Sequence, residues 1–416
     1  MKNLTDIRVK KMSNIIEDYL NCLDSIKETF NNNYPILTRA KTKAEKSKNN
    51  FLRSYTVDDL TKKPILIKDW KDKSKRANRA QQAEIIFPQS MLVSLVSQYD
   101  YLIGQLIGFI YEINPNSLKE SNSQISFKDL FSYNDINEIK NKIIRDKIDN
   151  ILRKSHEEQI DDLKKLANIK ELKKVSFWDE FIEITQRRNL LVHCKGEVSD
   201  QYIQKCSEVG IDIDCNKATL NVSEDYFNRA YFIFYIMGAE LSQVIIRHLL
   251  KKENLLSEID TILNKIIYDA IEEEKYDIAI ELSKFALADS TKHTCNLDLV
   301  YFVLNYAQAY KWSGNEEMCK KTLSTYDFTA TTSDILVAKF ALEDNIKKVV
   351  EHMKKAGNNS EIMNTNAYVS WAIFKNVRKI AEFQEAYKEI FGQDFTSELS
   401  FEENQVVKEF EEAVLN

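Results

Sequence analysis

Glycine and proline are unusually scarce in this sequence, and their scarcity limits what the chain can fold into. The 416 residues include only 8 Gly and 4 Pro, whereas an average protein uses these two residues at about 12% of its positions. Sheet proteins need turn residues roughly every 8–12 positions, while long helices joined by short loops need far fewer. Because 44% of the residues are apolar, the chain can bury a core and is not disordered. The composition therefore predicts an all-α fold.

The spacing of apolar residues places the expected helices. Positions three and four apart predict helices over residues 12–30, 88–113, 134–153, 157–172, 176–195 and 224–251. The first of these should end at the "NNNYP" segment, because a proline inside a helix removes a hydrogen bond. Residues 210–223 alternate enough to predict a small β-hairpin. Together these features predict an up-down helical bundle with one β-hairpin insertion.

The last third of the chain contains a weak internal repeat. The segments "EKYDIAIEL" and "GNEEMCKKTL" superpose with Ala279 on Cys319, and both resemble the turn between the two helices of a tetratricopeptide repeat. Val349 and Ala381 fall at the same place, and the spacings of 40, 30 and 32 residues average 34, the period of that repeat. An α-solenoid is therefore predicted for 252–416, with an irregular helical domain as the alternative.

These patterns divide the chain into three expected regions. They are an N-terminal helix with a basic segment (1–82), the helical bundle (83–251) and the tetratricopeptide-like repeats (252–416). The net charge of −6 combines −11 over the repeats with +5 over the residues before them. Such an asymmetry indicates a first part that faces nucleic acid and an acidic C-terminal part.

Positive charge is concentrated in residues 39–79, which hold 14 Lys/Arg and 5 Asp/Glu side chains. A stretch of this kind is expected to bind RNA with an affinity that weakens as salt rises. A solvated lysine-rich surface is the alternative. The candidates for RNA contact in this stretch are Lys73, Lys75, Arg76 and Arg79.

The sequence favours a reduced, cytoplasmic protein. Its N-terminus lacks the apolar core of a signal peptide, and its six cysteines form no C-x-x-C pair. The most apolar window, residues 230–250, contains Glu240 and Arg247, so we expect a buried core helix there and no membrane span. No glycine-rich phosphate loop occurs, and the cysteines near His193 do not have the spacing of a common zinc site. No cofactor and no metal are expected.

The helix predicted over 176–195 contains an arginine that its apolar pattern does not explain. The helix should begin at a capping box formed by Ser176 and Asp179 and end at Gly196. Arg188 interrupts its apolar stripe, and an inward guanidinium needs a buried carboxylate or an anionic ligand. The stripe consists of Phe177, Phe181, Ile184, Arg188 and Leu191.

Two further polar side chains lie beside this arginine. Asn189 and His193 are four residues apart and share a helix face, and His193 falls in the last turn, where the helix dipole favours a protonated ring. Such a group can cleave RNA: the arginine stabilises the phosphoryl oxygens, and the histidine moves the proton of the 2′-hydroxyl or of the leaving oxygen. The predicted catalytic residues are therefore Arg188, His193 and, in a supporting role, Asn189.

Two neighbouring cations are weaker candidates for contact with RNA. Arg187 lies four residues after Glu183, and the two can pair on the helix surface. Lys195 could contact a phosphate, although the helix dipole explains a lysine at a helix end equally well.

The segment "RRNLLVHCKG" resembles the R-x4-6-H motif of the HEPN superfamily, with Arg188, the polar Asn189 after it, and His193 after four intervening residues. The resemblance implies an up-down helical bundle with this motif near the end of one helix. Many HEPN domains are metal-independent endoribonucleases that dimerise to form a composite cleft. Two residues depart from the family pattern: Cys194 stands where many relatives have Asn, and Lys195 stands where a toxin subgroup has Tyr.

The first functional hypothesis is a homodimeric HEPN endoribonuclease, a toxin or effector in prokaryotic antiviral defence by abortive infection. Because one histidine cannot easily be both acid and base, a second copy would complete the site. The repeats would bind a trigger or a protein partner. The alternative is a non-catalytic RNA- or protein-binding module in which an acid holds Arg188, the candidates being Glu180, Glu183 and Asp100. A purely structural scaffold gives no reason for an arginine in the stripe.

Overall fold

The computed structural model describes residues 2–118, 133, 135–169, 176–213, 219–250, 255–288 and 291–395. Its helices confirm the predicted all-α class. The chain divides into two compact units, residues 1–255 and residues 256–416. They are called the first and the second unit.

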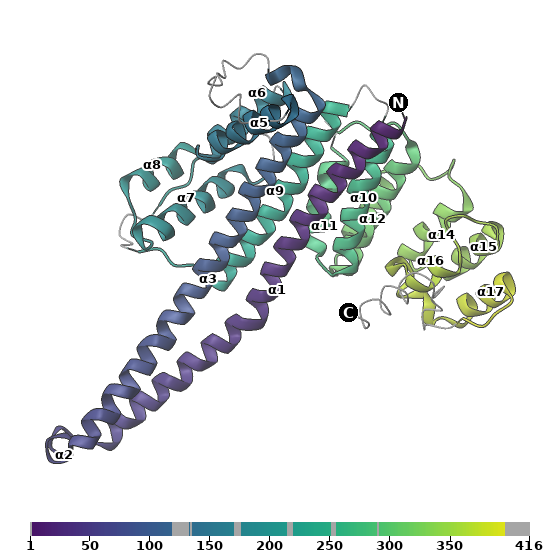
Figure 1. The fold of residues 1–416 in the computed structure, drawn as a ribbon. Coiled ribbons are helices and arrows are strands. Elements are labelled where there is room, and N and C mark those ends of the chain that lie inside the picture. The colour runs from purple at the N-terminus through teal and green to yellow at the C-terminus, as the bar shows by residue number, and fades with distance from the viewer. Residues whose placement is uncertain are drawn as a thin grey trace. The chain divides into compact units, whose positions relative to one another are not determined.

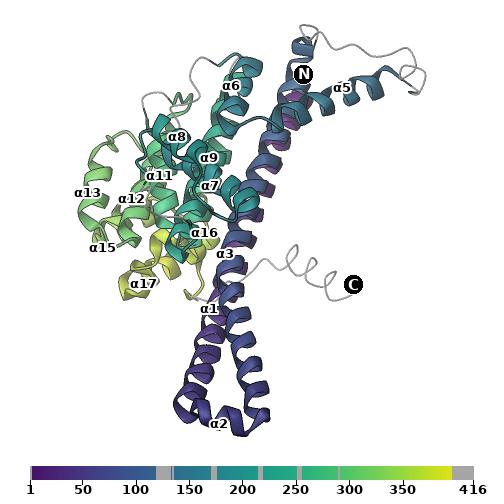
Figure 2. The same ribbon diagram turned by 90° about the vertical axis from the view of Figure 1, so that its left-hand side faces the viewer.

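Two very long helices dominate the first unit. The helices α1 (Lys2–Ser54) and α3 (Pro64–Ile113) run antiparallel, and the short α2 (Val57–Lys62) lies at the turn between them (Figure 1). The boundary expected between residues 82 and 83 falls inside α3. We call residues 36–86 the arm; this part of the hairpin, with α2 at its tip, projects from the other helices of the unit (Figure 2).

Two prolines lie inside these helices, which the sequence did not predict. The helix α1 continues through Pro35 where we expected it to end, and α3 begins well before Pro88. Each proline removes one backbone hydrogen bond, and contacts between the two helices near these positions hold the chain helical. These contacts are the stacked rings of Phe30 and Phe87, with centroids 5.9 Å apart, and the ion pair of Lys41 with Glu84 at 2.6 Å.

The helix α9 (Glu224–Leu250) forms the centre of this unit and packs against both long helices. Its apolar window is long enough to cross a membrane by composition, but 78% of that window is buried inside the protein, as in a core helix. Gly238 lets α1 approach closely, because a Cβ atom there would lie 2.1 Å from the ring of Tyr19. The Tyr19 hydroxyl donates to the carbonyl oxygen of Phe234 at 2.8 Å, which ties the two helices together.

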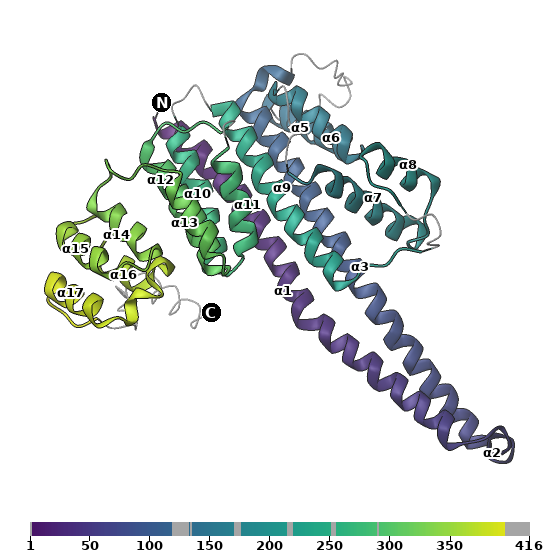
Figure 3. The same ribbon diagram turned by 180° about the vertical axis from the view of Figure 1, so that it is seen from behind.

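Four shorter helices complete the first unit on the other side of α3 (Figure 3). They are α5 (Ile136–Leu152), α6 (His156–Ala167), α7 (Trp178–Cys194) and α8 (Asp200–Glu208), with the 3-10 turn η1 (Pro115–Leu118) following α3. The described residues contain no β-strand, so the predicted hairpin is corrected to one antiparallel bridge, between Glu197 and Thr219. Residues 214–218 lie outside the described residues. The bridge forms in place of a hairpin because Leu220 donates to the Gly196 carbonyl oxygen at 2.8 Å, so residues 219–220 pair with the end of α7.

The second unit consists of helical hairpins with its own hydrophobic core. Its helices are α10 (Leu256–Glu272), α11 (Tyr276–Ala286), α12 (Asn296–Trp312), α13 (Glu316–Ser324), α14 (Ser333–Leu342), α15 (Ile346–Ala356), α16 (Thr365–Ser370) and α17 (Ala381–Phe391), with the 3-10 turns η3 (Ala372–Phe374) and η4 (Val377–Lys379). Three hairpins share one turn, in which Glu274, Gly314 and Asp344 have positive φ.

The three aligned positions of the internal repeat follow these turns. Ala279, Cys319 and Val349 are buried, and each backbone N–H donates to the residue that follows the positive-φ position. Ala381 differs, because it is exposed at the start of α17 and follows a 3-10 turn. The same turn therefore precedes three of the four aligned positions and is absent before the fourth.

Candidate active-site cleft

A cleft of about 470 Å³ lies beside the second half of α7. Its walls come from α3, from the turn between α5 and α6, and from α6, α7 and α8. We call it the Arg188 cleft. Its charged and titratable lining residues are Asp100, Arg153, Lys154, His156, Arg188, His193, Cys194, Tyr202 and Lys205.

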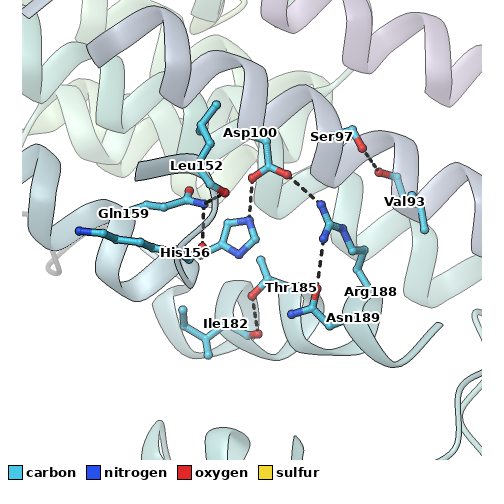
Figure 4. Close-up of polar contacts among 11 residues, drawn as sticks. Val93, Ser97, Asp100, Leu152, His156, Gln159, Ile182, Thr185, Arg188 and Asn189 are labelled. Carbon is cyan, nitrogen blue, oxygen red and sulfur yellow. Dashed lines mark hydrogen bonds and ion pairs between the residues drawn. The ribbon is translucent and has the colours of Figure 1, made fainter. Parts of the chain in front are cut away.

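Arg188 is fixed in this cleft by a carboxylate from another helix. Its Nη2 atom donates to Asp100 Oδ2 at 2.8 Å, and its Nη1 atom donates to Asn189 Oδ1 at 3.1 Å. Asp100 also accepts a hydrogen bond from His156 Nε2 at 3.0 Å, so it lies between the two side chains (Figure 4). Arg188 and Asp100 are 22% and 24% exposed, which leaves the pair open to the cleft.

This ion pair explains why an arginine stands in the apolar stripe of α7. Of the three acids considered from sequence, Asp100 is the partner, whereas Glu180 pairs with Arg229 and Glu183 with Arg187. The Arg188 Nε atom is buried and finds no acceptor in the described part of the chain. Each Nη atom keeps a second N–H, because a guanidinium carries five donors. The cation is therefore positioned by protein and still able to bind an anion.

His193 and Asn189 line the same cleft as Arg188, as the helical spacing predicted. His193 is exposed in the last turn of α7 and makes no hydrogen bond or ion pair to any residue that the structure describes. Lys195 ends the helix with a φ of 51° and is exposed, but it does not line the cleft. Gly196 needs its positive φ and its missing side chain, because a Cβ there would lie 2.6 Å from the Leu220 carbonyl oxygen.

The start of α7 differs from the expected capping box. Phe177 occupies the N-cap position with a positive φ and no capping side chain. Ser176 instead donates through its backbone N–H and its hydroxyl to the carboxylate of Glu240, both at 3.1 Å. Glu240 is buried inside α9, so the serine satisfies a buried charge that would otherwise be costly.

Arg187 was expected at the surface and is instead part of a buried network. Its Nε donates to Glu183 at 2.8 Å, and its guanidinium carbon lies 3.9 Å from the ring centroid of Tyr226. The hydroxyls of Tyr202 and Tyr226 also donate to Glu183. This network joins α7 to α8 and α9, so Arg187 is a structural residue and we withdraw it as a contact for RNA.

The open side of the cleft carries three basic side chains that the sequence did not point to, and carboxylates pair with two of them. Gln159 donates to the carbonyl oxygens of Leu152 and Lys154 at 3.2 and 3.1 Å, and so holds the turn that presents Arg153 and Lys154. The hydrogen bond to Asp162 raises the pKa of Lys154. On α8, the hydrogen bonds of Lys205 to Glu208 and then Glu157 raise its pKa. Both lysines are therefore charged but ion-paired, and Arg153 is the exposed cation here with no ion-pair partner in the described part of the chain.

Four of the predicted RNA contacts lie elsewhere. Lys73, Lys75, Arg76 and Arg79 are on the part of α3 that belongs to the arm. Lys73 pairs with Asp69 at 3.2 Å, and the other three are exposed. They do not line the Arg188 cleft.

Comparison with protein-family models, with curated protein sequences and with solved structures gives no match. The function must therefore be inferred from the cleft itself. An arginine fixed by a carboxylate, an exposed imidazole and the exposed Arg153 can bind a phosphate and move a proton beside it.

Proposed function

We propose that the first unit is a HEPN-type endoribonuclease acting in the cytoplasm, with the Arg188 cleft as its active site. The observation that carries the proposal is the meeting of Arg188, Asn189 and His193 in one cleft, with the guanidinium held by Asp100. A cation prepositioned in this way stabilises charge without having to reorganise during the reaction.

The proposed reaction uses the ribose as its own nucleophile. His193 removes the proton of the 2′-hydroxyl, and the 2′-oxygen attacks the adjacent phosphorus. The bond from phosphorus to the 5′-oxygen breaks, and the 5′-oxygen leaves with a proton. The products carry a 2′,3′-cyclic phosphate and a 5′-hydroxyl. Arg188 stabilises the negative charge that grows on the non-bridging oxygens, and Asn189 orients the guanidinium.

We further propose that the active form is a homodimer. His193 cannot easily take one proton and give another in the same step, so a second copy would supply the acid. The exposed end of α7, where Val192 is 51% exposed next to His193, is free for such a contact. The role as a toxin or effector in abortive infection rests on the HEPN resemblance, and the binding of a trigger or protein partner rests on the tetratricopeptide-like pattern.

A non-catalytic RNA- or protein-binding module is the second candidate, because one observation favours it. Arg188 is paired with an acid, as that hypothesis requires. A His193 far from any cleft or dimer axis would also favour it, but His193 lines this cleft. The balance therefore favours the enzyme.

The test is cleavage of end-labelled total RNA in EDTA by the wild-type protein, Arg188→Ala and His193→Ala. Arg229→Ala is the matched control, because Arg229 pairs with Glu180 and does not line the cleft. We expect cyclic-phosphate ends from the wild type and the control only. Equal cleavage by all four proteins would place the activity outside the Arg188 cleft.

A further inference from the structure

A second hollow lies on the arm, between α1 and α3, and we call it the arm groove. It is an open groove of about 470 Å³. The charged and aromatic residues of its lining are Lys43, Lys46, Phe51, Tyr55, Asp69 and Lys73. None of them lines the Arg188 cleft, so the groove is a separate feature of the first unit.

The charge of the arm groove favours a polyanion. Lys43 and Lys46 are exposed and have no ion-pair partner in the described part of the chain. Lys73 forms an ion pair with Asp69, which is the only acidic residue in the described lining. The groove therefore has a net positive charge within an arm that holds 14 basic and 5 acidic side chains over residues 39–79. Two arms with such an excess would repel each other.

The aromatic residues of the groove favour a ligand with unpaired bases. Tyr55 is 42% exposed, and its ring lies 4.9 Å from that of the buried Phe51. Phe51 in turn stacks on Trp70, with ring centroids 5.8 Å apart. The outer tyrosine is thus supported by the buried rings and is partly open to solvent. A base can stack on an exposed ring only when it is not paired within a duplex.

We propose that the arm groove binds single-stranded RNA, with a base on Tyr55 and phosphates on Lys43 and Lys46. The choice of RNA over single-stranded DNA rests on the proposed function. Lys73 and Asp100 are 27 residues apart on α3, or about 40 Å of helix. A strand long enough to reach from the groove to the Arg188 cleft is held at two points, which raises its effective concentration in the cleft.

The binding test uses the full-length His193→Ala protein, so that RNA is not cut, and fluorescein-labelled polyuridylate. We expect Tyr55→Ala to weaken binding about tenfold and Tyr55→Phe to bind like the parent, because stacking needs the ring and not the hydroxyl. The double variant Lys43→Gln/Lys46→Gln should lower the slope of log affinity against log salt by about 1.4, or about 0.7 per phosphate contact. Lys320→Gln/Lys321→Gln, two exposed lysines of α13, is the control with the same charge change.

Three results would overturn the proposal. They are unchanged binding by Tyr55→Ala and the arm double variant, an equal loss in the α13 control, and a preference of the groove for duplex RNA or anionic lipid vesicles over polyuridylate. The circular dichroism and thermal midpoint of Tyr55→Ala show whether a loss comes from the missing ring or from a misfolded arm.

A second readout separates this proposal from the nuclease itself. In the protein with His193 intact, the arm variants should slow cleavage of long RNA and leave cleavage of a dinucleotide unchanged, since a dinucleotide occupies only the cleft. If no RNA is cut at all, the nuclease proposal fails and the binding measurements still decide the arm groove.

Discussion

At the scale of single residues, Asp100 holds two side chains of the cleft at once. One carboxylate oxygen accepts from Arg188 and the other from His156, so the acid fixes the guanidinium and is itself fixed by the imidazole. We regard Asp100 as a positioning residue, because its effect on an RNA phosphate passes through Arg188.

Replacing Asp100 with Asn should therefore reduce catalysis more than stability. We expect kcat to fall by about tenfold to a hundredfold, because a misplaced catalytic group has effects of that size, while KM changes little. The thermal midpoint should move by only a few degrees, since a partly exposed ion pair contributes about 1 kcal/mol or less. Cleavage rates and thermal unfolding are measured together, with Glu180→Gln as the control on α7. A kcat equal to that of the parent would remove Asp100 from the site.

The buried thiols give a second prediction at this scale. Burial raises the pKa of Cys206 and of Cys319 to about 11, whereas an ordinary thiol has a pKa of about 8.5. At pH 8.5 both should stay protonated and resist iodoacetamide, while the exposed Cys22 and Cys194 react. Because the folded pKa is the higher one, this contribution to stability is present below about pH 8.5 and is lost as the pH rises through 11.

Mass spectrometry after labelling tests the thiol prediction, with unfolded protein as the control in which every thiol reacts. The urea midpoint at pH 8 and at pH 10.5 tests the loss of stability. Labelling of Cys206 at the rate of Cys194 would contradict the assigned burial.

The residues of the site were predictable only where they share one helix. Arg188, Asn189 and His193 lie within six positions of α7, so helical spacing alone places them together. The sequence also shows that Arg188 needs an acid, and Asp100 was one of three candidates. His156 could not be found in this way, because it meets Asp100 across 56 residues through the packing of α6 against α3.

At the scale of elements, the contact of α1 with α9 depends on the missing side chain of Gly238. A Cβ atom there would lie 2.1 Å from the Tyr19 ring, so Gly238→Ala should lower the free energy of unfolding by about 2–3 kcal/mol through overpacking. Gly108→Ala is the matched control, because its Cβ would meet only Ile148, at 3.9 Å. That change should raise the free energy of unfolding by about 0.5–1 kcal/mol, since alanine favours the helix.

Urea unfolding of both glycine variants provides the measurement. If Gly238→Ala were as stable as the parent, α1 would not pack on α9 as described. In a Tyr19→Ala background, Gly238→Ala should cost less stability than it does in the parent, because the ring that causes the clash is then absent.

The helices that pack against a core on much of their surface were predictable from apolar spacing. The predicted bounds of α5, α7 and α9 lie within two residues of the observed ones, whereas α6, expected over 157–172, ends at Ala167. Apolar spacing fails for the full length of α1 and α3, which pass through Pro35 and Pro88 because the two helices support each other over a long contact. It also fails for residues 219–220, whose partner is the distant end of α7 and not the neighbouring segment.

At the scale of the whole molecule, net charge and the two candidate sites are divided between the two parts of the chain. Residues 252–416 carry a net charge of −11 and the residues before them +5, and the buried residues of α12 to α17 form one cluster within the second unit. The Arg188 cleft and the arm groove are both built from residues of the first unit alone. The proposed chemistry and the proposed RNA contacts should therefore not need the repeats.

A fragment of residues 1–255 tests that separation. We expect it to fold, because a unit of this size buries enough apolar surface for a stable core, and to cleave a dinucleotide within a few-fold of the full-length rate. The fragment 256–416 should unfold cooperatively on its own and cut no RNA. Circular dichroism with urea follows folding, and the His193→Ala version of the first fragment controls for contaminating nuclease. A first fragment that folds but cuts nothing, beside an active full-length chain, would show that the repeats complete or activate the site.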